Sequence, residues 1–142
     1  SAQLLPYANG KVEFIGFCIG GRLVYLGACI LDNVDAAVDC WGGGVTKGND
    51  EPNPGRSRWP IESTEGLNCP ILGLFGEDDD RPSPADVAET EAELKRLNKN
   101  FEFHTYSGAG HNFLIVDRPS YRQEAATDGW EKVIRFFGKH LS

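Results

Sequence analysis

The sequence predicts an α/β fold, a three-layer α/β/α arrangement around a mostly parallel sheet. Segments rich in β-branched and aromatic residues alternate with segments whose apolar residues recur at helical spacing. The first strand-like segment, residues 11–17, is mostly apolar on both faces, as a central parallel strand would be. A chain of 142 residues is long enough for one domain, so we expect residues 1–142 to form a single α/β unit.

Local signals place the individual elements. Strands are expected at residues 11–17, 35–41, 70–76 and 101–106, and helices at residues 22–30, 84–98 and 120–140. Ser83 and Pro84 mark the start of the second helix, as its N-cap and first helical residue. Residues 45–68 contain three prolines and form a long connection, of a length that is usually functional or mobile, which could contribute a lid.

The hexapeptide GFCIGG, residues 16–21, lies between the first strand and the first helix. A tight, strained turn that presents a nucleophile requires small residues two positions before and after it, here Gly16 and Gly20. Gly21 would let the helix approach the sheet closely. Cys18 would then project from the helix N-terminus, where the dipole favours thiolate, and the backbone N–H of Ile19 would face an oxyanion formed beside the sulfur.

Two further candidate groups follow later strands. The acidic turn 78–80 leaves the third strand, and His111 lies in the loop after the fourth. Because the carboxyl ends of parallel strands meet at one edge, these groups and Cys18 are expected close together. In a triad the histidine takes the thiol proton and the aspartate orients the imidazole. The alternatives are a small residue in a tight turn, a solvated acidic turn and a loop histidine; His104 and His140 are expected to be structural or solvated.

Composition excludes several classes of function. The chain has 14 basic and 21 acidic residues, a net charge of −7, which repels phosphate backbones and anionic membranes. Nucleic acid and membrane are therefore not expected as partners, and no apolar run is long enough to span a bilayer. The acidic turn lacks the glycine and glutamate spacing of a calcium loop, so no metal is expected.

The four cysteines are expected to be reduced. They stand at positions 18, 29, 40 and 69, without the C-x-x-C spacing of metal sites or redox pairs, and three lie in or beside apolar runs. Buried thiols of this kind, and a start without a signal-peptide pattern, indicate a cytoplasmic protein.

Three motifs together resemble the dienelactone hydrolases of the α/β-hydrolase fold. They are GFCIGG at residues 16–21, LFGEDD at residues 74–79 and YSGAGHNF at residues 106–113. The resemblance runs from about residue 3 to the C-terminus. It implies hydrolysis of esters or lactones through an acyl-enzyme, without metal or cofactor. The nucleophile falls on Cys18, the histidine on His111 and the aspartate of a Gly-x-x-Asp turn on Asp79, with Asp78 and Asp80 as close alternatives.

The sequence departs from this family in two respects. Members that hydrolyse dienelactone hold its carboxylate with arginines, one shortly after the histidine, whereas the first arginine after His111 is Arg118. The family is also longer at the N-terminus, so the chain is expected to be a truncated hydrolase fold lacking the N-terminal strands. Residues 11–17 would then form an exposed edge, and we expect that edge to pair in a homodimer or with a separate N-terminal chain.

Two functions therefore remain open at the level of sequence. The first is a cysteine-dependent hydrolase acting on a small-molecule ester or lactone. The second is a non-catalytic or weakly active half-fold that acts as an assembly or binding domain, because loss of an oxyanion donor typically lowers a rate by ~10²–10³.

Overall fold

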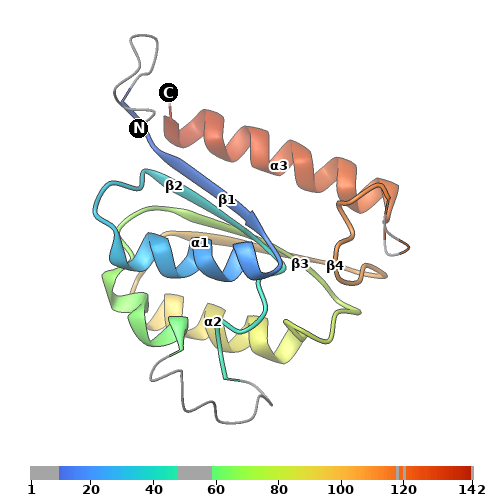
Figure 1. Cartoon of the computed structure of the whole chain (residues 1–142), viewed down its shortest axis with the longest axis horizontal. Helices are drawn as coiled ribbons and strands as arrows, with labels where there is room; N and C mark the ends of the chain where they lie inside the picture. Colours follow the sequence, from blue (N-terminus) through green and yellow to red (C-terminus); the bar gives the residue numbers. More distant parts are fainter. Residues whose placement is uncertain (1–9, 48–58, 118, 120, 142) are drawn as a thin grey trace.

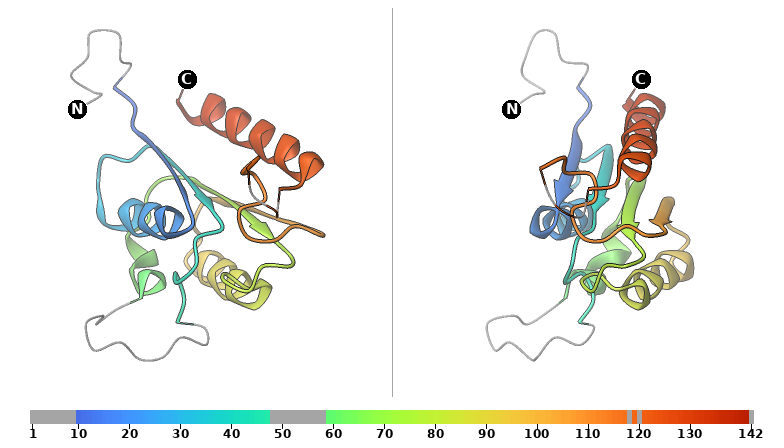
Figure 2. Two further views of the ribbon diagram at one scale, coloured as in Figure 1. Left: turned by 45° about the vertical axis from the view of Figure 1, so that its right-hand side comes forward. Right: turned by 90° about the vertical axis from the view of Figure 1, so that its right-hand side faces the viewer.

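A computed structural model describes residues 10–47, 59–117, 119 and 121–141. Its centre is a sheet of four parallel strands in the order β1-β2-β3-β4. The strands are β1 (Glu13–Phe17), β2 (Ala36–Cys40), β3 (Ile71–Gly76) and β4 (Phe101–Tyr106). The right-hand view of Figure 2 shows them following one another across the sheet. The predicted strands and their parallel pairing are confirmed.

Helices cover both faces of the sheet. Helices α1 (Ile19–Ile30) and α2 (Pro84–Arg96) lie on one face, and α3 (Gln123–Leu141) lies on the other (Figure 1). Each face has its own apolar core. The first joins α1 and α2 to the sheet and includes Tyr25, Ala28, Ala37, Ile71 and Leu94. The second joins α3 to the sheet and includes Val38, Leu72, Leu74, Val133 and Phe136. The three-layer α/β/α architecture is therefore confirmed.

Some element boundaries differ from the sequence-based expectation. Helix α1 begins at Ile19 rather than Arg22, because the carbonyl of Cys18 accepts the backbone N–H groups of both Gly21 and Arg22. Helix α3 begins at Gln123 rather than at position 120. Within the described residues no helix has the length and apolarity needed to cross a bilayer.

The long connection contains a helical turn that the sequence did not reveal. The 3₁₀ helix η2 (Pro60–Gly66) packs beside α1, where the hydroxyls of Tyr25 and buried Thr64 are 2.5 Å apart. Residues 48–58, where the suggested lid would lie, are outside the described part of the chain. The start of α2 is as predicted, because the Ser83 hydroxyl accepts the backbone N–H of Asp86 at 3.2 Å.

Strand β1 forms one edge of the sheet as described. It pairs only with β2 among the described strands, and Ile15 at its centre is 38% exposed. Large apolar side chains are also exposed on the helices flanking both faces. They are Ile19, Leu23 and Ile30 on α1, and Trp130 and Ile134 on α3. The expected exposed edge at residues 11–17 is thus accompanied by apolar surface from both helical layers.

Candidate active site

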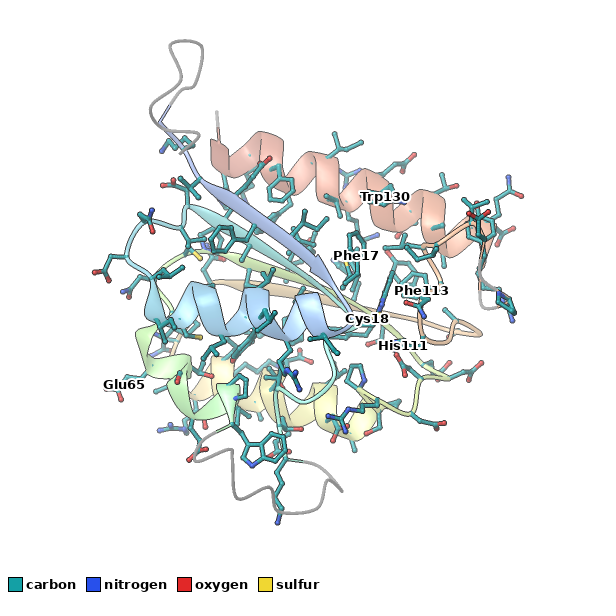
Figure 3. The ribbon with its side chains drawn as sticks, viewed as in Figure 1. Phe17, Cys18, Glu65, His111, Phe113 and Trp130 are labelled. Carbon is teal, nitrogen blue, oxygen red and sulfur yellow. The ribbon has the colours of Figure 1, made fainter. Side chains whose placement is uncertain are left out.

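Cys18 occupies the sharp turn between β1 and α1. Its backbone has φ 57° and ψ −120°, a conformation that non-glycine residues rarely adopt. The turn is tight on the strand side, since a Cβ at Gly16 would lie 2.2 Å from the carbonyl oxygen of Gly20. The N–H of Cys18 donates to the carbonyl of Cys40 on β2 at 3.1 Å. The strand–turn–helix geometry expected for a nucleophile elbow is present (Figure 3).

The two other glycines of the hexapeptide have different roles. A Cβ at Gly20 would meet no described atom within 4 Å, so the expectation that this position must lack bulk is not supported by contacts in the described structure. A Cβ at Gly21 would lie 2.4 Å from Oδ1 of Asp39 and 3.0 Å from the Cys40 carbonyl. Gly21 therefore permits the close approach of α1 to the end of β2.

Asp79 pairs with His111. Its Oδ2 lies 2.8 Å from Nδ1 of the imidazole, while its Oδ1 accepts the backbone N–H of Arg81 at 2.8 Å. Asp79 is 6% exposed, whereas Asp78 and Asp80 are exposed. Of the three adjacent aspartates, the one at the end of the Gly-x-x-Asp turn is the one that reaches the histidine.

The three predicted residues come together at the carboxyl edge of the sheet, as the topology requires. An open cleft of about 500 Å³ is lined by Cys18, Ile19 and His111, with Asp79 behind the imidazole. Figure 3 shows Cys18 and His111 at neighbouring positions beyond the strand ends. The volume lies within the usual range of small-molecule sites. His104 and His140 line a different cleft, between β4 and α3.

Two arginines far apart in the sequence also line this cleft. They are Arg22 on α1 and Arg81 in the turn after β3. A Cβ at Gly44 would lie 2.9 Å from a guanidinium nitrogen of Arg22 and 3.0 Å from one of Arg81. The glycine run after β2 thus makes room for two converging guanidinium groups. Neither arginine was predicted, because the resemblance pointed only to arginines after His111.

The sulfur of Cys18 has two hydrogen-bond partners that the sequence argument also missed. The indole Nε1–H of Trp41 donates to Sγ at 3.0 Å, and Sγ lies 2.9 Å from Oδ1 of Asn112. These contacts span 23 and 94 positions of sequence, so no local pattern could have shown them.

The other three cysteines are free thiols in apolar surroundings. All are buried, while Cys18 is partly exposed. Burial raises the pKa of the Cys29 thiol to about 12 and that of Cys69 to about 11, and it raises the pKa of Cys40 still further. These thiols are held in the neutral form. Among the described residues no group of three or more His, Cys, Asp or Glu side chains is arranged to hold a metal ion.

Comparison with solved structures relates this architecture to hydrolases. The crystal structure of "Putative Dienelactone Hydrolase" from Klebsiella pneumoniae aligns with a TM-score of 0.80 and 33% identity, over 91% of this chain and 52% of that one. An acylaminoacyl peptidase from Pyrococcus horikoshii aligns with a TM-score of 0.79 at 18% identity, a likeness of fold alone.

Comparison of sequences identifies the family. A Synechocystis protein named "Putative carboxymethylenebutenolidase" is 36% identical over 141 residues, which are 99% of this chain and 55% of that protein. The Escherichia coli K12 protein of the same name is 34% identical over 92% of this chain and 46% of its own length. The chain thus spans about half the length of these relatives. The dienelactone hydrolase family matches residues 1–141, and the chain belongs to that family.

Proposed function

We propose that this chain hydrolyses esters or lactones with Cys18 as nucleophile, His111 as general base and acid, and Asp79 as the group that orients the imidazole. The observation that carries the proposal is the 2.8 Å pair between Asp79 and His111 at the same cleft as a cysteine in a strained turn. Nucleophile, base and orienting group in this relation are the arrangement that activates weak nucleophiles in acyl transfer.

The roles follow from the hydrogen bonds. With Nδ1–H of His111 donating to Asp79, the other ring nitrogen is left as the base that removes the thiol proton. The thiolate of Cys18 attacks the acyl carbon of the substrate, and the backbone N–H of Ile19 at the start of α1 stabilises the negative charge that forms on the carbonyl oxygen. When the tetrahedral intermediate collapses, the bond to the leaving oxygen breaks and that oxygen takes the proton from His111. Water, deprotonated by the same imidazole, then cleaves the thioester and regenerates the thiol.

Hydrolysis of p-nitrophenyl acetate tests the proposal. We expect turnover by the native chain, loss of turnover in Cys18→Ala, and a burst of p-nitrophenol equal to the concentration of active sites if the acyl-enzyme accumulates. Asp79→Asn should lower kcat by about 10²-fold or more, because the imidazole loses its orienting acceptor. Asp78→Asn is the matched control, since that carboxyl is exposed and adjacent.

The second candidate, a non-catalytic binding domain, makes the opposite prediction. Because the chain spans about half of its relatives, its own turnover is a separate question from theirs. Equal rates for the native chain and Cys18→Ala would reject the hydrolase proposal and favour this alternative.

A further inference from the structure

Three residues with left-handed backbone converge on one sulfur atom. Cys18, Trp41 and Asn112 have φ of 57°, 42° and 66°. Among described non-glycine residues the only other positive φ is that of Asn98, which lies just beyond the end of α2 and away from the cleft. Such conformations in bulky residues persist where the surrounding structure enforces them, and they cluster at functional sites. The side chains of Trp41 and Asn112 both hydrogen-bond to the Cys18 thiol.

Trp41 is positioned rigidly against the sulfur. Its side chain is fully buried, with ring centroids 5.5 Å from Phe17 and 5.1 Å from Phe113, and its backbone N–H donates to the carbonyl of Leu74 at 2.8 Å. The indole N–H is a donor only. It can therefore hydrogen-bond to a thiol or a thiolate, and the bond to the charged form is the stronger one.

Asn112 lies on the other side of this interaction. Its amide oxygen is an acceptor, and at 2.9 Å from Sγ it can accept the S–H proton of the neutral thiol. A thiolate has no proton to offer to that oxygen. The amide oxygen therefore favours the protonated sulfur and competes with His111 for its proton.

We propose that Trp41 and Asn112 are catalytic residues that act on the Cys18 sulfur in opposite directions: the indole N–H of Trp41 stabilises the thiolate, and the amide oxygen of Asn112 stabilises the thiol. Both touch the reacting atom. The proposal rests on the proposed function for its meaning in catalysis, but it concerns the protonation of a thiol and can be tested without any ester.

Other charged and titratable groups surround the sulfur and must stay constant in the test. In the described structure they are His111, Arg22 and Arg81 in the cleft and the thiol of Cys40 on β2. None is altered by substitutions at positions 41 or 112. A change in thiolate population in those variants therefore reports on the two contacts themselves.

The experiment measures the rate at which iodoacetamide alkylates Cys18, followed by peptide mass spectrometry from about pH 5 to about pH 9, because only the thiolate reacts. Trp41→Phe should slow alkylation about tenfold at the acidic end of this range. Tenfold corresponds to the lower end of the free energy of a hydrogen bond to a charged group. Asn112→Ala should accelerate it about two- to tenfold, as expected for loss of a neutral hydrogen bond. Phe113→Leu, which alters the same aromatic cluster without removing a donor, should change the rate little.

Two safeguards keep the test decisive. Each rate is divided by that of the same protein unfolded in urea, and circular dichroism confirms that the variant is folded. If Trp41→Phe does not fold, 3-benzothienylalanine at position 41 keeps the bicyclic shape and replaces only the N–H.

An unchanged rate in a folded variant lacking the donor would overturn the role of Trp41. Slower alkylation in Asn112→Ala would mean that the amide donates to the thiolate, and would overturn the role of Asn112. If the two variants change the alkylation rate as expected but the native chain hydrolyses no ester, only the proposed hydrolase function is rejected.

Discussion

Replacement of Asp39 by asparagine should make the protein more stable at alkaline pH and leave it little changed at acidic pH. Asp39 is the residue before the last of β2, is 2% exposed, and lies opposite Gly16 and Gly73 on the two neighbouring strands. Its Oδ1 accepts the backbone N–H of Gly42 at 2.9 Å. Burial raises the pKa of this carboxyl to about 7, and the Gly42 hydrogen bond offsets only part of that effect.

The direction and size follow from the difference between folded and unfolded states. The carboxyl titrates near its ordinary value of 3.8 when unfolded and near 7 when folded. Between these values the folded protein holds a proton that the unfolded chain has lost. The contribution to stability is therefore complete below about pH 4 and is lost as the pH rises through 7. A difference of about three pH units corresponds to roughly 4 kcal/mol. Asparagine keeps the acceptor for Gly42 and cannot ionise.

Urea unfolding followed by circular dichroism gives the measurement. At about pH 8.5 Asp39→Asn should exceed the native protein in free energy of unfolding by roughly 3–4 kcal/mol, and the difference should shrink toward zero near pH 4. Asp32→Asn is the control for net charge, because Asp32 is exposed in the turn after α1. The reasoning fails if the native and Asp39→Asn profiles remain parallel across this range.

Three further outcomes are expected. Gly16→Ala should destabilise the chain by about 3 kcal/mol or prevent folding, because the added Cβ would lie 2.2 Å from a backbone oxygen. Gly20→Ala, where a Cβ meets no described atom within 4 Å, should instead stabilise α1 by roughly 0.5–1 kcal/mol, and equal changes in Tm for the two variants would refute this contrast. Arg81→Gln should lower kcat/KM for mono-p-nitrophenyl succinate about tenfold, because the carboxylate of this ester loses its contact with the guanidinium, and kcat/KM for the neutral p-nitrophenyl acetate should fall less. Equal losses for the two esters would exclude a role for Arg81 in selecting charged substrates. We also propose that the chain associates through the edge at residues 11–17, with a second copy or a separate N-terminal chain. A stable monomer at micromolar concentration in light scattering would contradict self-association, and an interface that leaves β1 in solvent would contradict pairing through this edge.

The parts of the site that follow strands were predictable from the sequence. Cys18 stands directly after β1 and His111 lies in the loop that follows β4, and parallel topology then brings them to one edge without further information. Asp79 was separable from its neighbours only by its place in a Gly-x-x-Asp turn. The structure gives the physical reason: Asp79 is buried with both carboxylate oxygens engaged, while its neighbours face solvent.

The parts that depend on packing between distant segments could not be predicted. Trp41 was expected only as the last residue of a strand, and its contact with the sulfur depends on the backbone conformation that ends β2. Arg22 and Arg81 reach one cleft because Gly44 leaves space between helix and turn. The early start of α1 was missed since glycines at positions 20 and 21 are poor helix formers, whereas the elbow itself supplies the first hydrogen-bond acceptor.

The backbone at position 41 indicates why a tryptophan stands there. Glycine adopts a φ of 42° without steric cost, and three glycines follow immediately at positions 42–44, so the chain had residues at hand to make this turn without strain. A bulky residue in this conformation costs on the order of 1–3 kcal/mol, which the buried aromatic contacts with Phe17 and Phe113 offset. Phenylalanine offers aromatic contacts of the same kind but has no ring N–H. The indole adds an N–H directed at the Cys18 sulfur, and we propose that this hydrogen bond is the reason for a strained tryptophan at position 41.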